Sequence, residues 1–457
     1  MAAPHSGAGL KPKDVPPLDG ELTTDPGALS AAADDFGHFV HKTPQFVLRP
    51  GSVADIAAII TWAKTQNLKV AARGQGHSTF GRPMVDGGVV VDMSTLNGIQ
   101  GVQSDRVVVD AGATWSAVLS AALAQGKTPP VLTSFIELSV GGTIAVGGIG
   151  PASHVHGMQT DNVLELEVVT GKGEIITCSA SNNSDLFNAA RAGLGQFGII
   201  TKATLKLIPA PARVRRFQLF YPDAAALTAD QLKVLDDNRF QHIQGAFIPN
   251  GSGGFRFQLE GGVYYTGSTP DDNAVLAGLS DTRAEAVIAD LSYQDYANAF
   301  DALENALRAN GQWFFPHPWW LTILPSSSAQ QTATEIAGEL TPDDLGQFGR
   351  VTYYPMTTNK ITTPLVRLPG GGTVFPFNLV RIPTTDDQGL AQAQVNENRA
   401  FYDRVRGRGG VLYPVSGFPM SSRDWRDHFG STWSQVASAK DKFDPGHILT
   451  PGYEVFV

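Results

Sequence analysis

Three glycine-rich stretches in the N-terminal half place the strongest constraint on how this chain can fold. They are Arg73-Gly74-Gln75-Gly76-His77-Ser78, residues 140–150 and residues 193–198. Glycine lets a backbone approach a neighbour closely, and successive N–H groups in such loops bind pyrophosphate. The Walker A motif is absent because no Gly-Lys-Ser/Thr follows the first stretch. The G-x-G-x-x-G motif is absent because the next glycine after Gly76 is Gly81. Two interpretations stay open: one large extended ligand, or tight turns in a crowded β domain.

The residues around these loops predict a β-rich first domain. Ser52 with Asp55 and the apolar stripe behind them predict the start of a helix, and residues 116–125 and 185–192 are also helical in pattern. Strands are predicted over residues 68–72, 88–94, 106–114 and 200–209, with a hairpin over 164–177. Because 457 residues exceed what one hydrophobic core usually supports, we expect two domains.

The sequence pattern of the chain changes after Pro209-Ala210-Pro211. Residues 213–417 contain long strand patterns, several of the tryptophans, and Ala-rich stretches that predict helices over 274–290 and 296–309. This indicates a second, α+β layer with aromatic walls. The last segment, from Asp424 onward, again predicts a helix, a turn and a short strand, and we expect it to return to the first domain.

Charge and cysteine content exclude several classes of protein. A formal net charge of −9 disfavours nucleic acid and anionic membranes as partners. The single cysteine, Cys178, excludes an internal disulfide framework. The first twenty residues contain no apolar core of signal-peptide length, and no run is long enough to span a bilayer. We therefore expect a cytoplasmic protein, without a membrane partner and without a metal site.

Seven blocks of the sequence occur in the order found in one known family. They are RGQGHS, SVGGT, HGMQTDNVLELEVVTGKGE, NSDLFNAARAGLGQFGIITKATLKL, PHPW, DWRDHFGSTWSQV and KFDPGHILTPG. In these blocks the chain resembles the cytokinin dehydrogenases, which belong to the wider family of vanillyl-alcohol-oxidase-type flavoproteins. The resemblance runs from about Asp35 to the C-terminus.

The resemblance implies a two-domain α+β fold that binds FAD. The implied FAD-binding domain is discontinuous, 1–212 with 418–457, and residues 213–417 would form a substrate (cap) domain. It also implies a covalent bond between His77 and the 8α-methyl carbon of the flavin. Cys178 lies outside the motif that supplies a second tether in related enzymes, so one covalent bond is expected. The implied cofactor-binding residues are Arg73, Gly74, Gln75, Gly76, His77, Ser78, Gly141, Gly142, Thr143, Gly147, Asp161, Asn162 and Ile199.

The chain departs from the family pattern at four polar positions. Ser134 stands where the family has the aspartate that takes the amine proton. Leu232 replaces a glutamate at the cavity mouth, and Leu321 replaces an asparagine near the aspartate. Near the end, Tyr453 replaces a glutamine. The site is therefore expected to be less polar than that of its relatives.

A serine cannot serve as the missing base, because its hydroxyl has no accessible charged form near neutral pH. Ser134 is thus expected to act as a hydrogen-bond partner, and another group must take the proton. Glu137 is disfavoured because an offset of three along an extended strand would point it to the opposite face. The residues expected to form the catalytic site are Ser134, His317, Trp319 and Tyr354, with His154, His156 and Tyr353 as further proton acceptors and Trp320, Phe314 and Phe315 as walls.

These features together predict an FAD-dependent oxidoreductase. The expected reaction removes a hydride from a C–N or C–OH bond of a small, mostly apolar substrate and passes the electrons to oxygen or a quinone-like acceptor. Two alternatives stay open: a true cytokinin dehydrogenase with a relocated base, and a flavin-binding protein whose catalysis has been lost.

Overall fold

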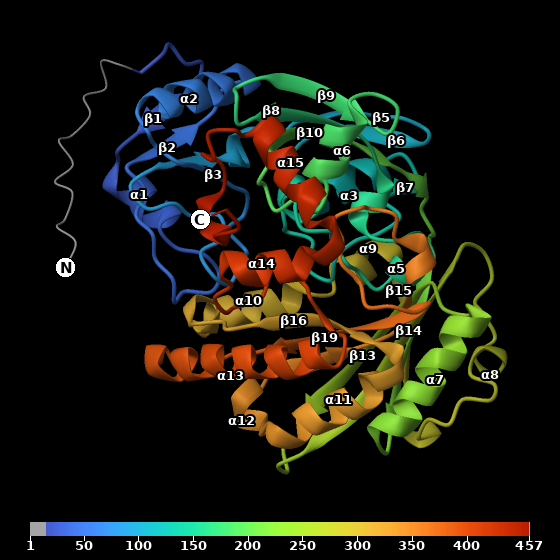
Figure 1. The fold of residues 1–457 in the computed structure, drawn as a ribbon. Coiled ribbons are helices and arrows are strands. Elements are labelled where there is room, and N and C mark those ends of the chain that lie inside the picture. The colour runs from blue at the N-terminus through green and yellow to red at the C-terminus, as the bar shows by residue number, and fades with distance from the viewer. Residues whose placement is uncertain (1–14, 457) are drawn as a thin grey trace.

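The computed structural model describes residues 15–456, which form two parts lying one above the other in Figure 1. Residues 1–14, which hold most of the stretch searched for a signal peptide, lie outside the described residues. The predicted α+β class is confirmed, since helices and sheets occur in both parts. Among residues 15–456, no helix has the length and apolar character needed to cross a bilayer.

A four-stranded sheet with two helices opens the upper part. Its strands, in order across the sheet, are β1 (Glu21–Thr23), β2 (Phe46–Arg49), β4 (Val89–Asp92) and β3 (Val70–Arg73), with α1 (Pro26–Ala32) and α2 (Val53–Thr65) beside them. The predicted helix start at Ser52 is confirmed. Asp55 fixes it: its buried carboxylate accepts the backbone N–H groups of Asp19, Gly20 and Gly51, each at 2.8 Å.

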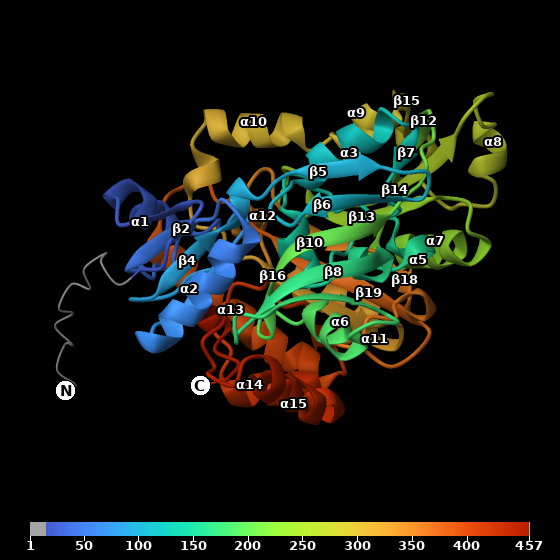
Figure 2. The same cartoon turned by 90° about the horizontal axis from the view of Figure 1, so that it is seen from above.

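A five-stranded antiparallel sheet completes the upper part, and Figure 2 shows it beside the four-stranded sheet. Its strands, in order, are β5 (Ile99–Val102), β6 (Arg106–Asp110), β10 (Gly198–Lys206), β8 (Val163–Thr170) and β9 (Ile175–Ser179). The associated elements are α3 (Trp115–Leu123), α4 (Val140–Ile144), α5 (Ser153–His156), α6 (Ser184–Ala190) and the pair β7 (Lys127–Thr128) and β11 (Ile208–Pro209). The predicted hairpin over 164–177 is confirmed, with Gly173 at φ +80° in its turn.

The lower part is one nine-stranded sheet covered by helices on one side (Figure 1). Its strands are β12 (Arg213–Tyr221), β13 (His242–Pro249), β14 (Phe255–Tyr265), β15 (Val287–Ser292), β16 (Trp320–Pro325), β17 (Arg350–Tyr353), β18 (Met356–Thr357), β19 (Thr373–Val380) and β20 (Val411–Leu412). Its helices are α7 (Ala224–Asp237), α8 (Asp272–Val275), α9 (Tyr293–Ala297), α10 (Asp301–Ala309), α11 (Ser326–Glu339), α12 (Pro342–Leu345) and α13 (Gln388–Gly407).

Two helices predicted in the lower part differ from the observed elements. The prediction of one helix over 274–290 is wrong. The α-helix α8 ends at Val275, and Gly278 follows it with φ +72°. The end of the predicted range lies in β15, which pairs with β12. Sheet pairing of the β-branched Val287 and Ile288 outweighs the helix propensity of the alanines before them. The helix predicted over 296–309 is interrupted, because α9 ends at Ala297 and α10 begins at Asp301.

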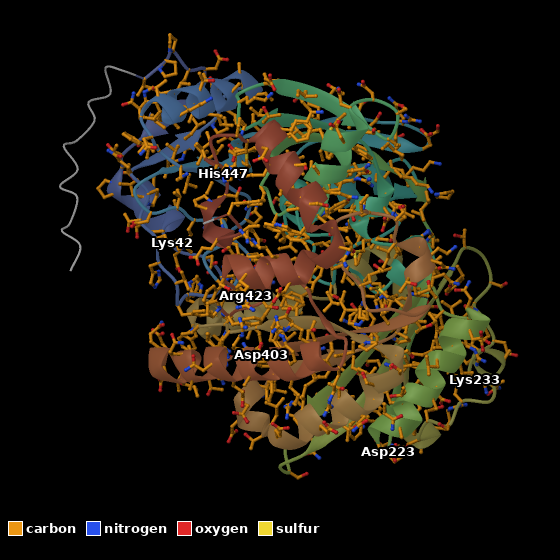
Figure 3. The ribbon with its side chains drawn as sticks, viewed as in Figure 1. Lys42, Asp223, Lys233, Asp403, Arg423 and His447 are labelled. Carbon is orange, nitrogen blue, oxygen red and sulfur yellow. The ribbon has the colours of Figure 1, made fainter. Side chains whose placement is uncertain are left out.

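The C-terminal segment returns to the upper part. It contains α14 (Ser422–Phe429) and α15 (Trp433–Phe443), and α14 lies along α13 where Figure 3 labels Arg423 and Asp403. The predicted short strand is reduced to a single parallel bridge between Leu449 and Val70 of β3. Backbone bonds on either side of Val70, from its N–H to Ile448 O and from Thr450 N–H to its carbonyl, are 2.8 Å long.

Candidate functional site

The three glycine-rich stretches line one cavity of roughly 200 Å³ in the upper part. The first contributes Gly74 to Ser78, the second Gly141 to Thr143 with Ala145 and Val146, and the third Leu194, Gly195 and Gly198 to Ile200. The C-terminal segment closes the cavity with Thr450 and Tyr453. Segments from residue 74 to residue 453 therefore share one site.

Close backbone approach explains the glycines of this cavity. A Cβ on Gly74 would lie 1.9 Å from Ser139 Oγ, and one on Gly141 would lie 2.8 Å from the Cβ of Ala111. Gly195 has φ +68°, which favours glycine, and a Cβ there would meet Thr450 Oγ1 at 2.8 Å. The same glycines therefore pack the loops tightly and leave a cavity between them.

Aromatic rings surround His77 at one end of this cavity. The ring centroid of Phe36 lies 4.1 Å and that of Phe135 4.8 Å from the imidazole, and Trp313 and Trp319 both lie at 5.8 Å. Burial, with a smaller contribution from the charge of Arg308, lowers the pKa of His77 to about 3. At neutral pH the imidazole is uncharged, and one ring nitrogen keeps the lone pair that a nucleophile needs.

A second cavity, of roughly 370 Å³, also reaches His77. It shares Gln75, Gly76 and His77 with the first cavity, so the imidazole lies at the wall of both. The upper part contributes Phe36, Phe135 and Glu137 to it, and the lower part contributes Glu304, Arg308, Trp313 and Phe314. This cavity lies between the two parts of the chain.

Most of the predicted cofactor-binding residues line the first cavity. They are Gly74, Gln75, Gly76, His77, Ser78, Gly141, Gly142, Thr143 and Ile199. Arg73 lies on the second cavity, where its guanidinium donates to the Asp34 carbonyl at 2.5 Å.

Gly147, Asp161 and Asn162 do not line either cavity. The Asp161 carboxylate accepts the N–H groups of Thr362 and Thr363 at 2.8 and 2.9 Å and so joins the upper part to a loop of the lower part. The Asn162 amide donates to two carbonyls of its own turn.

The four predicted catalytic residues lie in different surroundings. Ser134 is exposed, and its Oγ accepts Gln244 Nε2 at 3.4 Å. Trp319 is half-buried near His77, and its indole N–H donates to the Arg381 carbonyl at 2.7 Å. Neither Ser134 nor Trp319 lines the two cavities.

His317 and Tyr354 are buried. The Nδ1 of His317 donates to the Phe36 carbonyl at 3.1 Å, its ring stacks 4.1 Å from the Phe36 ring, and its Nε2 has no partner among residues 15–456. Burial lowers the pKa of His317 to about 3 and raises that of Tyr354 above its usual value. His154, another candidate base, has both ring nitrogens 3.0 Å from backbone carbonyls.

The replaced family positions are also placed by the structure. Leu232 lies exposed on α7, while its neighbour Gln231 is buried and donates to the Tyr353 carbonyl at 2.7 Å. Leu321 lies within β16, opposite Asn378 of β19. Tyr453 lines the first cavity.

The sequence interpretation missed Arg82, which lines the first cavity although it is only 5% exposed. Its terminal nitrogens donate to the carbonyls of Gly452 and Phe418, while its Nε has no partner among the described residues. The residues next to Arg82 in the sequence do not indicate its position, since the carbonyl groups it binds lie more than three hundred residues away.

The strand expected around Glu137 is absent from the structure. Residues 132–138 form no strand, so an offset of three does not separate faces there, and Glu137 lies on the second cavity with His77. Among residues 15–456 its carboxylate has no hydrogen-bond or ion-pair partner within the usual distances. It is the acidic side chain of this cavity that is free to meet a ligand.

The residues that line the first cavity suit FAD. It offers glycine loops whose close packing leaves no room for side chains, a buried arginine with a free N–H for an anionic pyrophosphate, and an uncharged histidine. Across residues 15–456, no cluster of three or more His, Cys, Asp or Glu side chains is placed to hold a metal ion.

Comparison with known families agrees with this site. One family profile, described as "FAD binding domain", matches residues 44–179, and another, described as "Cytokinin dehydrogenase 1, FAD and cytokinin binding", matches residues 241–456. The crystal structure of 6-hydroxy-D-nicotine oxidase from Arthrobacter nicotinovorans superposes with a TM-score of 0.73, covering 96% of this chain and 98% of that one. At 21% identity this likeness shows the fold alone.

Relatives of similar length are more similar in sequence. An uncharacterized oxidoreductase, ORF5 in the fasciation locus of Rhodococcoides fascians, is 40% identical over 96% of this chain and 99% of its own length. Cytokinin dehydrogenase 10 of Oryza sativa subsp. japonica is 35% identical over 100% of this chain and 92% of that protein. Such identity over whole chains shows that this protein belongs to the cytokinin dehydrogenase family of FAD-dependent oxidoreductases, with the vanillyl-alcohol-oxidase-type fold.

Proposed function

We propose that the first cavity holds FAD and that His77 is bonded covalently to the 8α-methyl carbon of the flavin. The observation that carries the proposal is the position of an uncharged imidazole at the end of a cavity lined by three glycine-rich loops. We further propose that residues 1–212 and 418–457 form the FAD-binding unit. Support for this division comes from Lys440 of α15, whose ammonium donates to the Gln196 carbonyl in the third loop at 2.9 Å.

The bound flavin would supply hydride acceptance, followed by transfer of the electrons to oxygen or a quinone-like acceptor. The protein's own residues would position the reactants. The aromatic side chains Phe135, Trp313 and Trp319 near His77 would exclude water and pack against a planar or apolar substrate.

For the proton, we propose Glu137 as the acceptor. Ser134 has no ionisable group, and burial lowers the pKa of His77 and His317 to about 3, so their imidazoles hold a proton poorly. Glu137 is the carboxylate that shares a cavity with His77 and has no partner of its own among residues 15–456. Its oxygen atoms would accept a proton from an amine or a hydroxyl group as the hydride leaves the neighbouring carbon.

We propose as substrate a small, mostly apolar amine or alcohol that is oxidised at a C–N or C–OH bond. Support comes from the aromatic rings that surround His77, those of Phe36, Phe135 and Trp313. A true cytokinin dehydrogenase with Glu137 as relocated base is the second candidate, and the family match over residues 241–456 favours it.

A substrate screen tests these proposals. The purified yellow protein is mixed anaerobically with single amines and alcohols, including N6-isopentenyl adenine, and bleaching of the flavin absorbance is followed. Rapid bleaching by small amines or alcohols but not by the adenine derivative supports the main proposal. Rapid bleaching by the adenine derivative supports the second candidate. No bleaching by any compound would favour a flavin-binding protein without catalysis.

A further inference from the structure

A short strap from the N-terminal region, residues 34–38, holds the loop that carries His77. Two backbone hydrogen bonds join them: Phe36 N–H donates to the Gly76 carbonyl at 2.9 Å, and Gly37 N–H donates to the Ser78 carbonyl at 3.1 Å. These bonds lie on either side of His77 in the loop. The strap therefore fixes the backbone of the residues that flank the imidazole.

Asp35 fastens the strap to the loop. Its Oδ2 accepts the Ser78 hydroxyl at 2.6 Å and the Gly81 N–H at 2.7 Å, and its Oδ1 accepts the Gly37 N–H at 3.0 Å. The side chain is 2% exposed and forms no ion pair within 4 Å among residues 15–456. A buried carboxylate without a cationic partner is unfavourable unless its hydrogen bonds serve the fold or the site.

The strap also reaches the imidazole and the lower part of the chain. The Phe36 ring lies 4.1 Å from the rings of both His77 and His317. The backbone N–H of His317 donates to the Gly37 carbonyl at 2.9 Å. A shift of the strap would consequently move the ring that packs on His77 as well as the loop backbone.

We infer that Asp35 is a positioning residue for the covalent attachment of FAD: by clamping Ser78 and Gly81 it holds the His77 imidazole in the direction from which it bonds the flavin. The inference rests on the attachment at His77 proposed above. Asp35 does not touch the imidazole through its carboxylate, whose contacts are with Gly37, Ser78 and Gly81. It acts through the loop.

Formation of the covalent bond needs no reactant other than His77 and the flavin until its last step. A nitrogen of the His77 imidazole loses its proton, one C–H bond of the 8α-methyl group breaks and one C–N bond forms. Both hydrogens and two electrons end on the flavin ring system. Molecular oxygen removes them as hydrogen peroxide and restores the oxidised cofactor.

The test compares Asp35→Asn with a matched buried carboxylate, Asp55→Asn. Asp55 is 3% exposed and also ties a loop by accepting backbone N–H groups, but it lies at the start of α2. Each purified holoprotein is measured for total flavin per chain, for the fraction of flavin that stays in the acid-precipitated pellet, and for Tm. We expect the ratio of non-covalent to covalent flavin to rise roughly tenfold in Asp35→Asn and to stay at the wild-type value in Asp55→Asn, with Tm lowered in both.

Several outcomes would overturn the inference. A wild-type ratio in Asp35→Asn contradicts it, and so does an equal rise in Asp55→Asn, because that result would mean a general effect of loosened loops. If Asp35→Asn gives no folded protein, Ser78→Ala removes the shortest hydrogen bond of the clamp, and an unchanged ratio there has the same meaning. Wild-type protein whose flavin is wholly non-covalent would instead refute the attachment at His77, and the role of Asp35 with it.

Discussion

Gly74 and Ser139 lie so close together that a Cβ on Gly74 would be 1.9 Å from the hydroxyl oxygen of Ser139. This contact joins the first glycine-rich loop to the start of the second, and both line the first cavity. The spacing between the two loops is thus set by the absence of one methyl group.

Substituting Gly74 with alanine should spread these two loops and weaken FAD binding. Overpacking in a closed contact typically costs about 1–3 kcal/mol, so Tm should fall and the flavin content of the purified protein should drop. Gly338→Ala is the matched control, because no other atom of the described residues, beyond its own helix backbone, lies within 4 Å of a Cβ there and the residue is inside α11. Equal flavin content in the two variants would show that the contact does not shape the site.

His77→Ala should separate binding of FAD from its attachment. The other cavity residues remain, so the variant should still purify with flavin, but acid precipitation should leave the yellow colour in the supernatant instead of the pellet. Substrate oxidation should be slower, because a histidyl bond draws electron density from the flavin. His447→Ala, on the partly exposed side chain labelled in Figure 3, should keep the colour in the pellet. Colour in the pellet of His77→Ala would refute the assignment.

The sequence was sufficient to predict features that local chemistry determines. The three glycine-rich loops, for which one extended ligand or tight turns were both open, line one cavity, because each loop by itself shows the glycines that close backbone approach requires. Arg82 could not be found in this way, since its burial depends on Phe418 and Gly452 from the far end of the chain. Glu137 was misjudged because its direction depends on a segment that is neither helix nor strand.

The buried ion pair between Lys440 and Asp444 should anchor the C-terminal segment beneath the third glycine-rich loop. The two side chains are 1% and 0% exposed, and their charged atoms lie 2.7 Å apart. Lys440→Met leaves a buried carboxylate without its partner and should lower the free energy of unfolding by about 3–5 kcal/mol. Lys442→Met, on the same helix, breaks an exposed pair with Asp185 and should change it by less than about 1 kcal/mol. Urea unfolding of both variants measures the difference, and similar values would contradict the anchoring role.

Asp35 should make the stability of the protein depend on pH in an unusual direction. Burial raises the pKa of its carboxyl from 3.8 to about 6. The folded protein therefore holds this proton more tightly than the unfolded chain, and the group's contribution to stability is lost as pH rises from about 4 to about 6, by about 3 kcal/mol. Between about pH 4 and about pH 6, the free energy of unfolding of Asp35→Asn should therefore rise by the same amount relative to that of the wild type. A difference that is constant with pH would show that Asp35 titrates normally.

Glu137, and not the residue at position 134, should accept the proton of the substrate. Glu137→Gln keeps the size and hydrogen-bonding ability of the side chain but removes its charge, so kcat/KM for an amine or alcohol substrate should fall by roughly 100- to 10,000-fold, the usual contribution of a general base. Tm should stay at the wild-type value, which a loss of folding would not produce. Glu174→Gln, in the exposed turn between β8 and β9, is the control and should leave both unchanged. If Glu137→Gln retains wild-type kcat/KM, the proton is taken elsewhere.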